Sequence, residues 1–137
     1  MLAVGKDLKV TVDGSESDWK HLLDVHKPPH GEDDWFGLLF WPLLQAAAEI
    51  PTLRRVFPST SVNSLVVFRD GQAWKAPVEE RWPAVSVGSD GLYTVRSQAW
   101  SRDARDLLVT RDPGEAVRCL AGLIEGIIGE TGQDSGR

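Results

Sequence analysis

Apolar and polar residues alternate in several short stretches of the chain. In residues 7–13, Leu8, Val10 and Val12 alternate with polar positions, which is typical of a strand with one buried face. The other stretches with strand character are residues 63–70, 72–78, 84–87, 92–100 and 105–111. Asp-Gly pairs at 70–71 and 90–91 favour tight hairpin turns between neighbouring stretches. The pattern after residue 62 therefore predicts an antiparallel meander.

A short amphipathic helix is predicted before the meander, over residues 18–26. It ends before Pro28 and Pro29, because proline lacks an N–H and the residue before a proline avoids the helical region. Its N-cap would be Ser17 or Asp18. One face of the helix would present the apolar residues Trp19, Leu22 and Leu23.

The next segment is apolar on nearly all sides, so it should be central or form an interface. Because proline suits the first turn of a helix, we expect a helix that begins near Pro42 and is closed by Pro51. Residues 35–41 would form a preceding helical piece that kinks at Pro42. Residues 52–57 would then add one further helical turn, ended by Pro58.

The last element is a long amphipathic helix. Asp112 and Pro113 occupy its N-cap and first positions, and Glu115 is placed to reach back as in a capping box. Gly122 and Gly126 would permit a close approach of another backbone. The apolar stripe that should cover one face of the sheet consists of Val117, Leu120, Ala121, Leu123, Ile124, Ile127 and Ile128.

Together these elements predict a single α+β domain over residues 1–129. Its antiparallel β-meander of about five strands would pack against N-terminal helices and a C-terminal helix. Residues 130–137 are expected to form a disordered tail.

Composition narrows the classes of function. The net charge of −5 argues against general nucleic-acid binding, although the acidic excess lies within residues 1–51 and the remainder could hold an arginine patch. The single cysteine excludes an internal disulfide and fits a reducing cytoplasm. Residues 35–44 are the most apolar run, far shorter than the roughly 20 residues that span a bilayer, and the N-terminus lacks the apolar core of a signal peptide. We therefore expect a cytoplasmic protein with neither a nucleic-acid nor a membrane partner.

All three histidines lie within residues 21–35, accompanied by four carboxylates. His26 and His30 have the spacing by which a helix directs two imidazoles at one metal ion. The two prolines between them prevent a regular helix, so we expect solvated loop histidines and assign no metal ligands. If the protein is an enzyme, His21, His26 and Asp24 are the candidates for acid–base catalysis.

Other reactive groups lack the context that catalysis needs. Cys119 lies inside the last helix and should pack as a small hydrophobe. Asp33 and Asp34 are sequence neighbours, which does not direct two carboxylates at one atom, and one of them should cap the apolar segment that follows. The sequence contains no glycine-rich phosphate loop, and we expect no cofactor.

Tryptophan and arginine gather around the predicted meander. Six tryptophans against one tyrosine is an unusual ratio, and Trp and Arg are over-represented where proteins hold partners. The alternative is that the tryptophans fill the core between sheet and helix. The candidate ligand-binding residues are Arg69, Trp74, Trp82, Arg96 and Trp100.

A series of short motifs runs through residues 50–128: Leu53, Arg54, Phe57, Pro58 and Ser61; Leu65 and Arg69; Asp90, Gly91, Tyr93 and Val95; and Glu115, Ala116 and Val117. In this order they resemble a family of small, mostly actinobacterial proteins labelled natural-product biosynthesis proteins. The chain departs from that pattern at Ser59, where an aromatic residue is common, and at Val62, where a histidine is expected. The resemblance implies a biosynthetic context and no particular reaction.

Three hypotheses follow. The first, which we favour, is an accessory or binding protein in actinobacterial natural-product biosynthesis that holds a peptide, a metabolite or a partner enzyme through the Trp/Arg surface. The second is a small cofactor-independent cyclase or isomerase that uses the candidate histidines and aspartate. The third is an immunity- or chaperone-like interaction protein whose interface is residues 35–44, exposed or buried in a homodimer.

Overall fold

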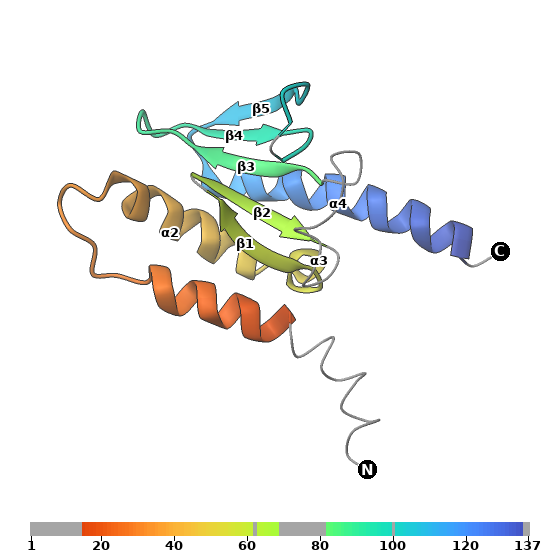
Figure 1. Ribbon diagram of the computed structural model, residues 1–137, viewed down its shortest axis with the longest axis horizontal. Helices are drawn as coiled ribbons and strands as arrows, with labels where there is room; N and C mark the ends of the chain where they lie inside the picture. Colours follow the sequence, from red (N-terminus) through yellow and green to blue (C-terminus); the bar gives the residue numbers. More distant parts are fainter. Residues whose placement is uncertain (1–14, 62, 69–81, 100, 136–137) are drawn as a thin grey trace, which may run out of the picture.

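Five antiparallel strands form one sheet in which each strand pairs with the next in sequence (Figure 1). The computed structural model describes residues 15–61, 63–68, 82–99 and 101–135. The strands are β1 (Phe57–Ser61), β2 (Ser64–Phe68), β3 (Ala84–Val87), β4 (Tyr93–Arg96) and β5 (Asp106–Thr110). The helices are residues 15–26, α2 (Trp35–Ala48), α3 (Pro51–Arg54) and α4 (Pro113–Ser135). The predicted α+β fold with its five-stranded meander is confirmed.

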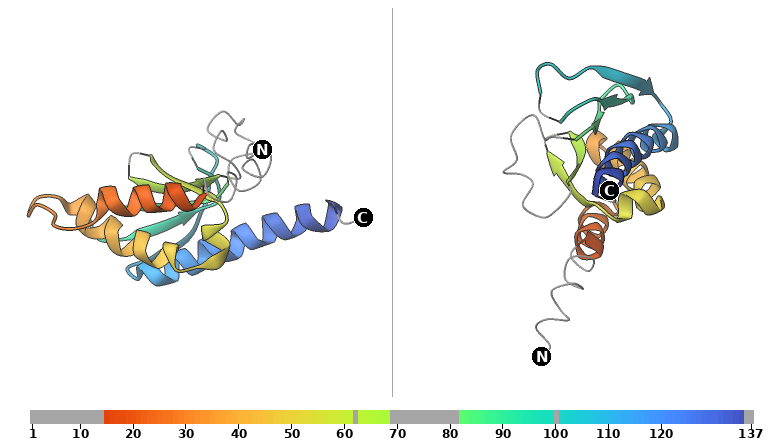
Figure 2. Two further views of the ribbon diagram at one scale, coloured as in Figure 1. Left: turned by 90° about the horizontal axis from the view of Figure 1, so that it is seen from below. Right: turned by 90° about the vertical axis from the view of Figure 1, so that its right-hand side faces the viewer.

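The helices α2 and α4 cover one face of the sheet, which curves over them (Figure 2). The helix α4 packs against β3, β4, β5 and α2, and its C-terminal part extends beyond the sheet (Figures 1 and 2). The expected strand over residues 7–13 and the expected returning strand over residues 72–78 lie outside the described residues. In the described part of the chain, no helix combines the length and the apolar character that crossing a membrane requires.

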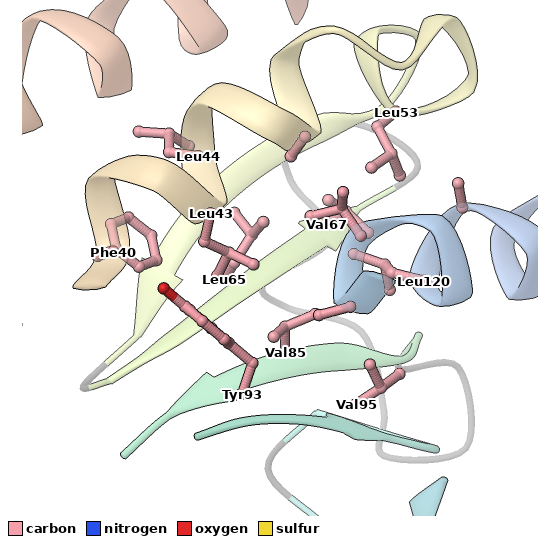
Figure 3. Close-up of a cluster of buried hydrophobic side chains, with 14 of the residues drawn as sticks. Phe40, Leu43, Leu44, Leu53, Leu65, Val67, Val85, Tyr93, Val95 and Leu120 are labelled. Atoms are coloured by element: carbon pink, nitrogen blue, oxygen red, sulfur yellow. The ribbon is translucent and has the colours of Figure 1, made fainter. Parts of the chain in front are cut away.

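The main core fills the space between the sheet and the helices (Figure 3). Alternate residues of the strands point into it, as the period of two in the sequence predicts. Burying each large apolar side chain stabilises the fold by roughly 1.5–3 kcal/mol. Its fully buried members include Phe40, Leu43 and Leu44 of α2, Leu65 of β2, Val85 of β3, Val95 of β4, and Leu120 and Ile124 of α4.

Trp19 attaches the N-terminal helix, residues 15–26, to the rest of the domain. Its side chain is fully buried, and its Nε1–H donates to the carbonyls of Leu53 and Val56, each at 3.1 Å. Beside it, the Ser15 hydroxyl donates to the Arg54 carbonyl at 2.5 Å, and the Arg54 guanidinium lies over the indole ring. The predicted burial of Trp19 is confirmed, although the helix begins earlier than the predicted residue 18.

The long apolar helix begins at a cap provided by an aspartate. The carboxylate of Asp34 accepts a hydrogen bond from the Gly37 N–H at 2.8 Å, as expected of a helix N-cap. From there α2 continues as one helix to Ala48, with Pro42 inside it. The prediction that a helix begins near Pro42 is therefore wrong, because the capping aspartate and the burial of the apolar residues outweigh the cost of an internal proline.

A tyrosine from the sheet supports the turn around that proline. Pro42 has no N–H to donate to the carbonyl of Leu38, so one helical hydrogen bond is missing there. The Tyr93 hydroxyl on β4 points to α2 and donates to the adjacent carbonyl, that of Leu39, at 2.6 Å (Figure 3). Burial raises the pKa of the Tyr93 phenol, which keeps it protonated as a donor. The sheet thus supplies a hydrogen bond at the turn that the proline weakens.

Pro58 lies in a strand and does not end a helix. The helical turn expected over residues 52–57 is α3, which ends at Arg54, and Pro58 lies inside β1, paired with Val67 of β2. The predicted role of Pro58 as a helix terminator is therefore wrong. The strand β1 is at the edge of the sheet, where a residue without an N–H is tolerated because one side of the strand needs no partner.

At the start of α4, the Thr110 hydroxyl connects the N-cap residue to Glu115, in place of the direct hydrogen bond of a capping box. The Asp112 carboxylate accepts from the Gly114 N–H at 2.9 Å, as predicted for the N-cap. The Asp112 N–H donates to the Thr110 hydroxyl at 3.1 Å, and that hydroxyl donates to the Glu115 carboxylate. The helix continues to Ser135, past the boundary that the sequence predicted at residue 129.

The two glycines on α4 do not serve a close helix contact. A Cβ added at Gly122 or at Gly126 would meet nothing within 4 Å, and both residues are exposed. The prediction that they permit a close backbone approach is therefore wrong, since helix packing uses the opposite face.

Replacing Gly122 and Gly126 with alanine should stabilise the protein. Each change should add about 0.5–1 kcal/mol to the free energy of unfolding, because alanine is the better helix former and the added methyl group has open space. Urea denaturation measures the change. Gly91, whose φ is +86°, provides the control, because alanine there should destabilise the turn. A loss of stability in the α4 variants would contradict this account.

Candidate functional site

The sheet face opposite the helices carries a row of hydroxyl groups. In the strand register, Ser61 pairs with Ser64, Ser64 with Ser86, and Ser86 with Thr94. Residues paired in this way point to the same face of a sheet. The row therefore crosses β1 to β4, and the hydroxyls of Ser64 and Ser86 lie 3.1 Å apart, within hydrogen-bond distance.

A second row on the same face is apolar and ends at an arginine. Val66 of β2 pairs with Ala84 of β3, which pairs with Arg96 of β4. Val66 and Ala84 are buried and form a small second cluster with Ala99, against which Phe68 packs. This cluster gives the outer face of the sheet an apolar floor beside the hydroxyl row.

Between the two rows lies a hollow of about 250 Å³ that is open to solvent, called here the outer-face hollow. Its apolar lining is Val66, Ala84 and Ala99. Its polar lining among the described residues is Ser61, Asn63, Ser64, Ser86, Arg96 and Gln98. Pockets for drug-sized ligands occupy roughly 300–1,000 Å³, so this hollow suits a small molecule or one end of a larger one.

The guanidinium of Arg96 is held only loosely by its neighbours. Its Nε lies 3.3 Å from Oδ1 of Asp106, and its Nη2 donates to the Ala104 carbonyl at 3.3 Å. The ion pair lacks the geometry of a hydrogen bond, and the buried Nε has no acceptor among the described residues. The two side chains are 37% and 59% exposed, and exposed pairs of this kind contribute about 0–1 kcal/mol.

Of the two predicted ligand-binding residues that the structure describes, Arg96 lines the hollow. Trp82, a second candidate, is half-buried and packs against the main core instead. The other three candidates, Arg69, Trp74 and Trp100, lie outside the described residues.

The serine, asparagine and glutamine side chains of the hollow were missed in the sequence. The one available signal was the isolated polar residue at the outward position of a strand, such as Ser86 between Val85 and Val87. Such a position is also simply solvated in most antiparallel sheets. Only the strand register shows that Ser86 adjoins Ser64 and not a residue farther along β2.

The histidines do not converge on one point. His21 is exposed, whereas His26 packs edge-on against Phe40 with ring centroids 4.9 Å apart. The His30 ring donates from Nε2 to the His26 carbonyl at 2.6 Å. No three His, Cys, Asp or Glu side chains gather as metal ligands in the described part of the chain. The prediction that Asp33 or Asp34 caps the helix that follows is confirmed, with Asp34 as the cap.

The remaining candidates for chemistry are also apart from the hollow. Asp24 forms an exposed ion pair with Lys20 at 3.0 Å, and the hydrogen bond from Lys20 lowers the pKa of the carboxyl group. Cys119 lies half-buried in α4, where burial and the nearby Glu115 raise the pKa of its thiol. A thiol with a raised pKa is a weak nucleophile at neutral pH.

Protonation of His26 should destabilise the fold. Burial against the aromatic rings, with a smaller effect of His30, lowers the pKa of His26 from 6.5. The His26 imidazole therefore binds a proton more readily in the unfolded chain than in the folded chain. As a result, the free energy of unfolding should decrease as the pH falls below about 6.5. The decrease should be modest, because the ring is only partly buried.

Urea denaturation at about pH 7.5 and about pH 5 measures this dependence. His26→Gln should reduce the difference between the two free energies of unfolding. His21→Gln is the matched control, because this histidine is exposed and has the smallest effect on the pKa of His26, so its loss should reduce the difference much less. An equal dependence in wild type and His26→Gln would contradict the role of His26.

The apolar segment over residues 35–44 contributes mainly to the core. Phe40, Leu43 and Leu44 are fully buried, whereas Trp35 and Leu38 are 42% and 52% exposed. Only a narrow strip of the segment is therefore on the surface.

Most of the chain matches a protein-family model. Residues 15–129 match a protein family of unknown function, DUF6193, from the N-terminal helix through most of α4. No curated protein and no solved structure matches the chain significantly. Because the match extends over most of the sequence, the chain belongs to the DUF6193 family.

Proposed function

We propose that the protein is a binding protein, accessory to natural-product biosynthesis, that holds a metabolite or one end of a peptide in the outer-face hollow. The observation that carries the proposal is the composition of this hollow, in which apolar side chains adjoin hydroxyl groups and one arginine. Binding sites for small molecules combine apolar surface with a few polar groups in this way, because the apolar part supplies affinity and the polar part fixes orientation.

The arrangement of the side chains favours binding over catalysis. A serine hydroxyl becomes a nucleophile when an adjacent base accepts its proton. Ser64 and Ser86 contact each other, and the described lining includes no histidine or carboxylate. The acid–base candidates His21, His26 and Asp24 lie on the N-terminal helix and do not line the hollow.

The biosynthetic context rests on the resemblance of residues 50–128 to small actinobacterial proteins with that label. Its motif positions are mostly structural here, since Leu65, Tyr93 and Val95 belong to the main core. Among the motif positions that the structure describes, Ser61 lines the hollow. The single cysteine supports a cytoplasmic place for this function.

A thermal-shift screen of biosynthetic metabolites and short peptides tests the proposal. A ligand that binds the folded state raises the melting temperature, by an amount that corresponds to about 2.7 kcal/mol at 100 times its dissociation constant. The phenyl ring of Ser86→Phe should fill the hollow and abolish the shift. Thr94→Phe is the matched control, because Thr94 lies in the same hydroxyl row but does not line the hollow.

The expected result is a ligand that stabilises wild type and Thr94→Phe but not Ser86→Phe. Near-ultraviolet circular dichroism verifies that each variant is folded, and Ser64→Phe is a second blocking variant at the paired position. A ligand that stabilises the blocked variants equally would bind elsewhere and contradict the proposal. The absence of any shift across the screen would also contradict it.

A further inference from the structure

We propose that the outer-face hollow receives an oxyanion, either a carboxylate or a phosphate group of the ligand, and that Arg96 exchanges Asp106 for this group. The inference rests on the proposed function and specifies the chemical class of the ligand. It begins from the polarity of the hollow. Among the described residues, the polar lining combines one positive charge with hydroxyl and amide groups, and it contains no carboxylate.

The guanidinium of Arg96 is the charged group of this site. A planar guanidinium presents a fork of N–H donors that matches the two oxygens of a carboxylate or a phosphate. The contacts of the guanidinium within the protein satisfy its N–H donors only in part. The ion pair between Nε and Asp106 lacks hydrogen-bond geometry, and the hydrogen bond to the Ala104 carbonyl is long. An oxyanion in the hollow would therefore form better hydrogen bonds with Arg96 than the protein itself provides.

The serine pair supplies neutral donors to the same group. In the contact between Ser64 and Ser86, one hydroxyl donates and the other accepts. The proton of the accepting hydroxyl is not used in that bond, so it can turn towards a ligand oxygen. The register places Ser86 on β3 two residues from Ala84, which pairs with Arg96. The hydroxyl donors and Arg96 thus flank one small apolar floor.

The carboxylate of Asp106 pairs with Arg96 at the place where we propose that the oxyanion of the ligand binds. Its carboxylate is exposed and lies on the edge strand β5, outside the described lining of the hollow. An exposed ion pair is screened by solvent and is readily exchanged for a carboxylate or phosphate of better geometry. Removing the charge of Asp106 should therefore strengthen anion binding, whereas removing the charge of Arg96 should weaken it strongly.

Nuclear magnetic resonance titration of the full chain tests this exchange. Sodium phosphate and sodium acetate serve as probes at constant ionic strength, and acetamide serves as the neutral counterpart of acetate. We expect saturable shifts of the amide signals of Ala84, Ser86 and Arg96 with the anions and not with acetamide. The probe that binds more tightly distinguishes a phosphate ligand from a carboxylate ligand.

Substitutions at Arg96 and Asp106 test whether the charge of Arg96 binds the anion. Arg96→Gln should weaken anion binding about 10-fold or more, and Arg96→Lys should show a smaller loss, because it keeps the charge without the fork. Arg102→Gln is the matched control, because this exposed arginine does not line the hollow and its loss should change little. Asp106→Asn should tighten binding about 3-fold or more, as expected when a weak competing ion pair is removed.

Three results would overturn the inference. These are unchanged anion binding in Arg96→Gln, equal binding of acetamide and acetate, and weaker binding in Asp106→Asn. The proposed function can stand when the inference fails. A screened ligand that Ser86→Phe excludes, together with no anion binding in the hollow, would retain the binding function and reject the oxyanion. If no screened ligand binds in the hollow and no anion binds there, both the proposed function and the oxyanion inference are rejected.

Discussion

Replacing Trp19 with alanine is expected to lower the free energy of unfolding by about 3–5 kcal/mol, the range for truncating a large buried aromatic residue. The indole is fully buried between the N-terminal helix and α3. Its loss would leave a cavity and remove the donor shared by the carbonyls of Leu53 and Val56. A domain of ordinary stability, about 5–15 kcal/mol, would lose a large fraction of it.

Urea denaturation followed by circular dichroism measures this effect. Trp35→Ala is the matched control, because Trp35 is also helical but 42% exposed, and it should cost much less. Trp19→Phe should fall between wild type and Trp19→Ala, since it keeps an aromatic ring but not the N–H. Equal losses for Trp19→Ala and Trp35→Ala would show that the N-terminal helix is not anchored in this way.

The second large effect is expected at the contact between α4 and the sheet. Leu120 is fully buried in the main core, opposite Val85 and Val95 (Figure 3). Leu120→Ala should reduce the free energy of unfolding by about 2–5 kcal/mol, through lost burial and the cavity left behind. The width of this range reflects how far the neighbouring side chains can move to fill the cavity.

The matched control for this prediction is Leu38→Ala. Leu38 also lies within a helix, but its side chain is 52% exposed. The substitution should change stability by no more than about 0.5 kcal/mol, as for most surface positions. If both leucines gave the same small effect, the packing of α4 on the sheet would be contradicted.

Much of the fold was predictable because its elements repeat short periods. The alternation around Val85 and the apolar stripe through Leu120 each specify an element and its buried face. The errors occurred where local rules compete with burial. Pro42 favours a helix start, yet the capped apolar helix includes it, and Pro58 would end a helix but lies in an edge strand.

The outer-face hollow was less predictable than the fold. Arg96 was singled out because arginine and tryptophan gather near the meander, not because of its position. Ser64 and Ser86 are far apart in the sequence and meet only through the register of β2 and β3. The alternation along one strand indicates which residues share a face, whereas the pairing with the next strand also depends on the connection between the two strands. A binding site built across several strands therefore becomes visible only in the folded structure.

Mapping the binding site of a ligand from the screen tests whether the outer-face hollow is the site of binding. In a nuclear magnetic resonance titration of the isotope-labelled protein, we expect the largest amide shifts at Ser64, Ala84, Ser86 and Arg96, around the outer-face hollow. Ser86→Phe should abolish these shifts while preserving the folded spectrum. Shifts concentrated instead on residues 21–44, with the hollow unaffected, would show that the ligand binds elsewhere and would overturn the proposed function.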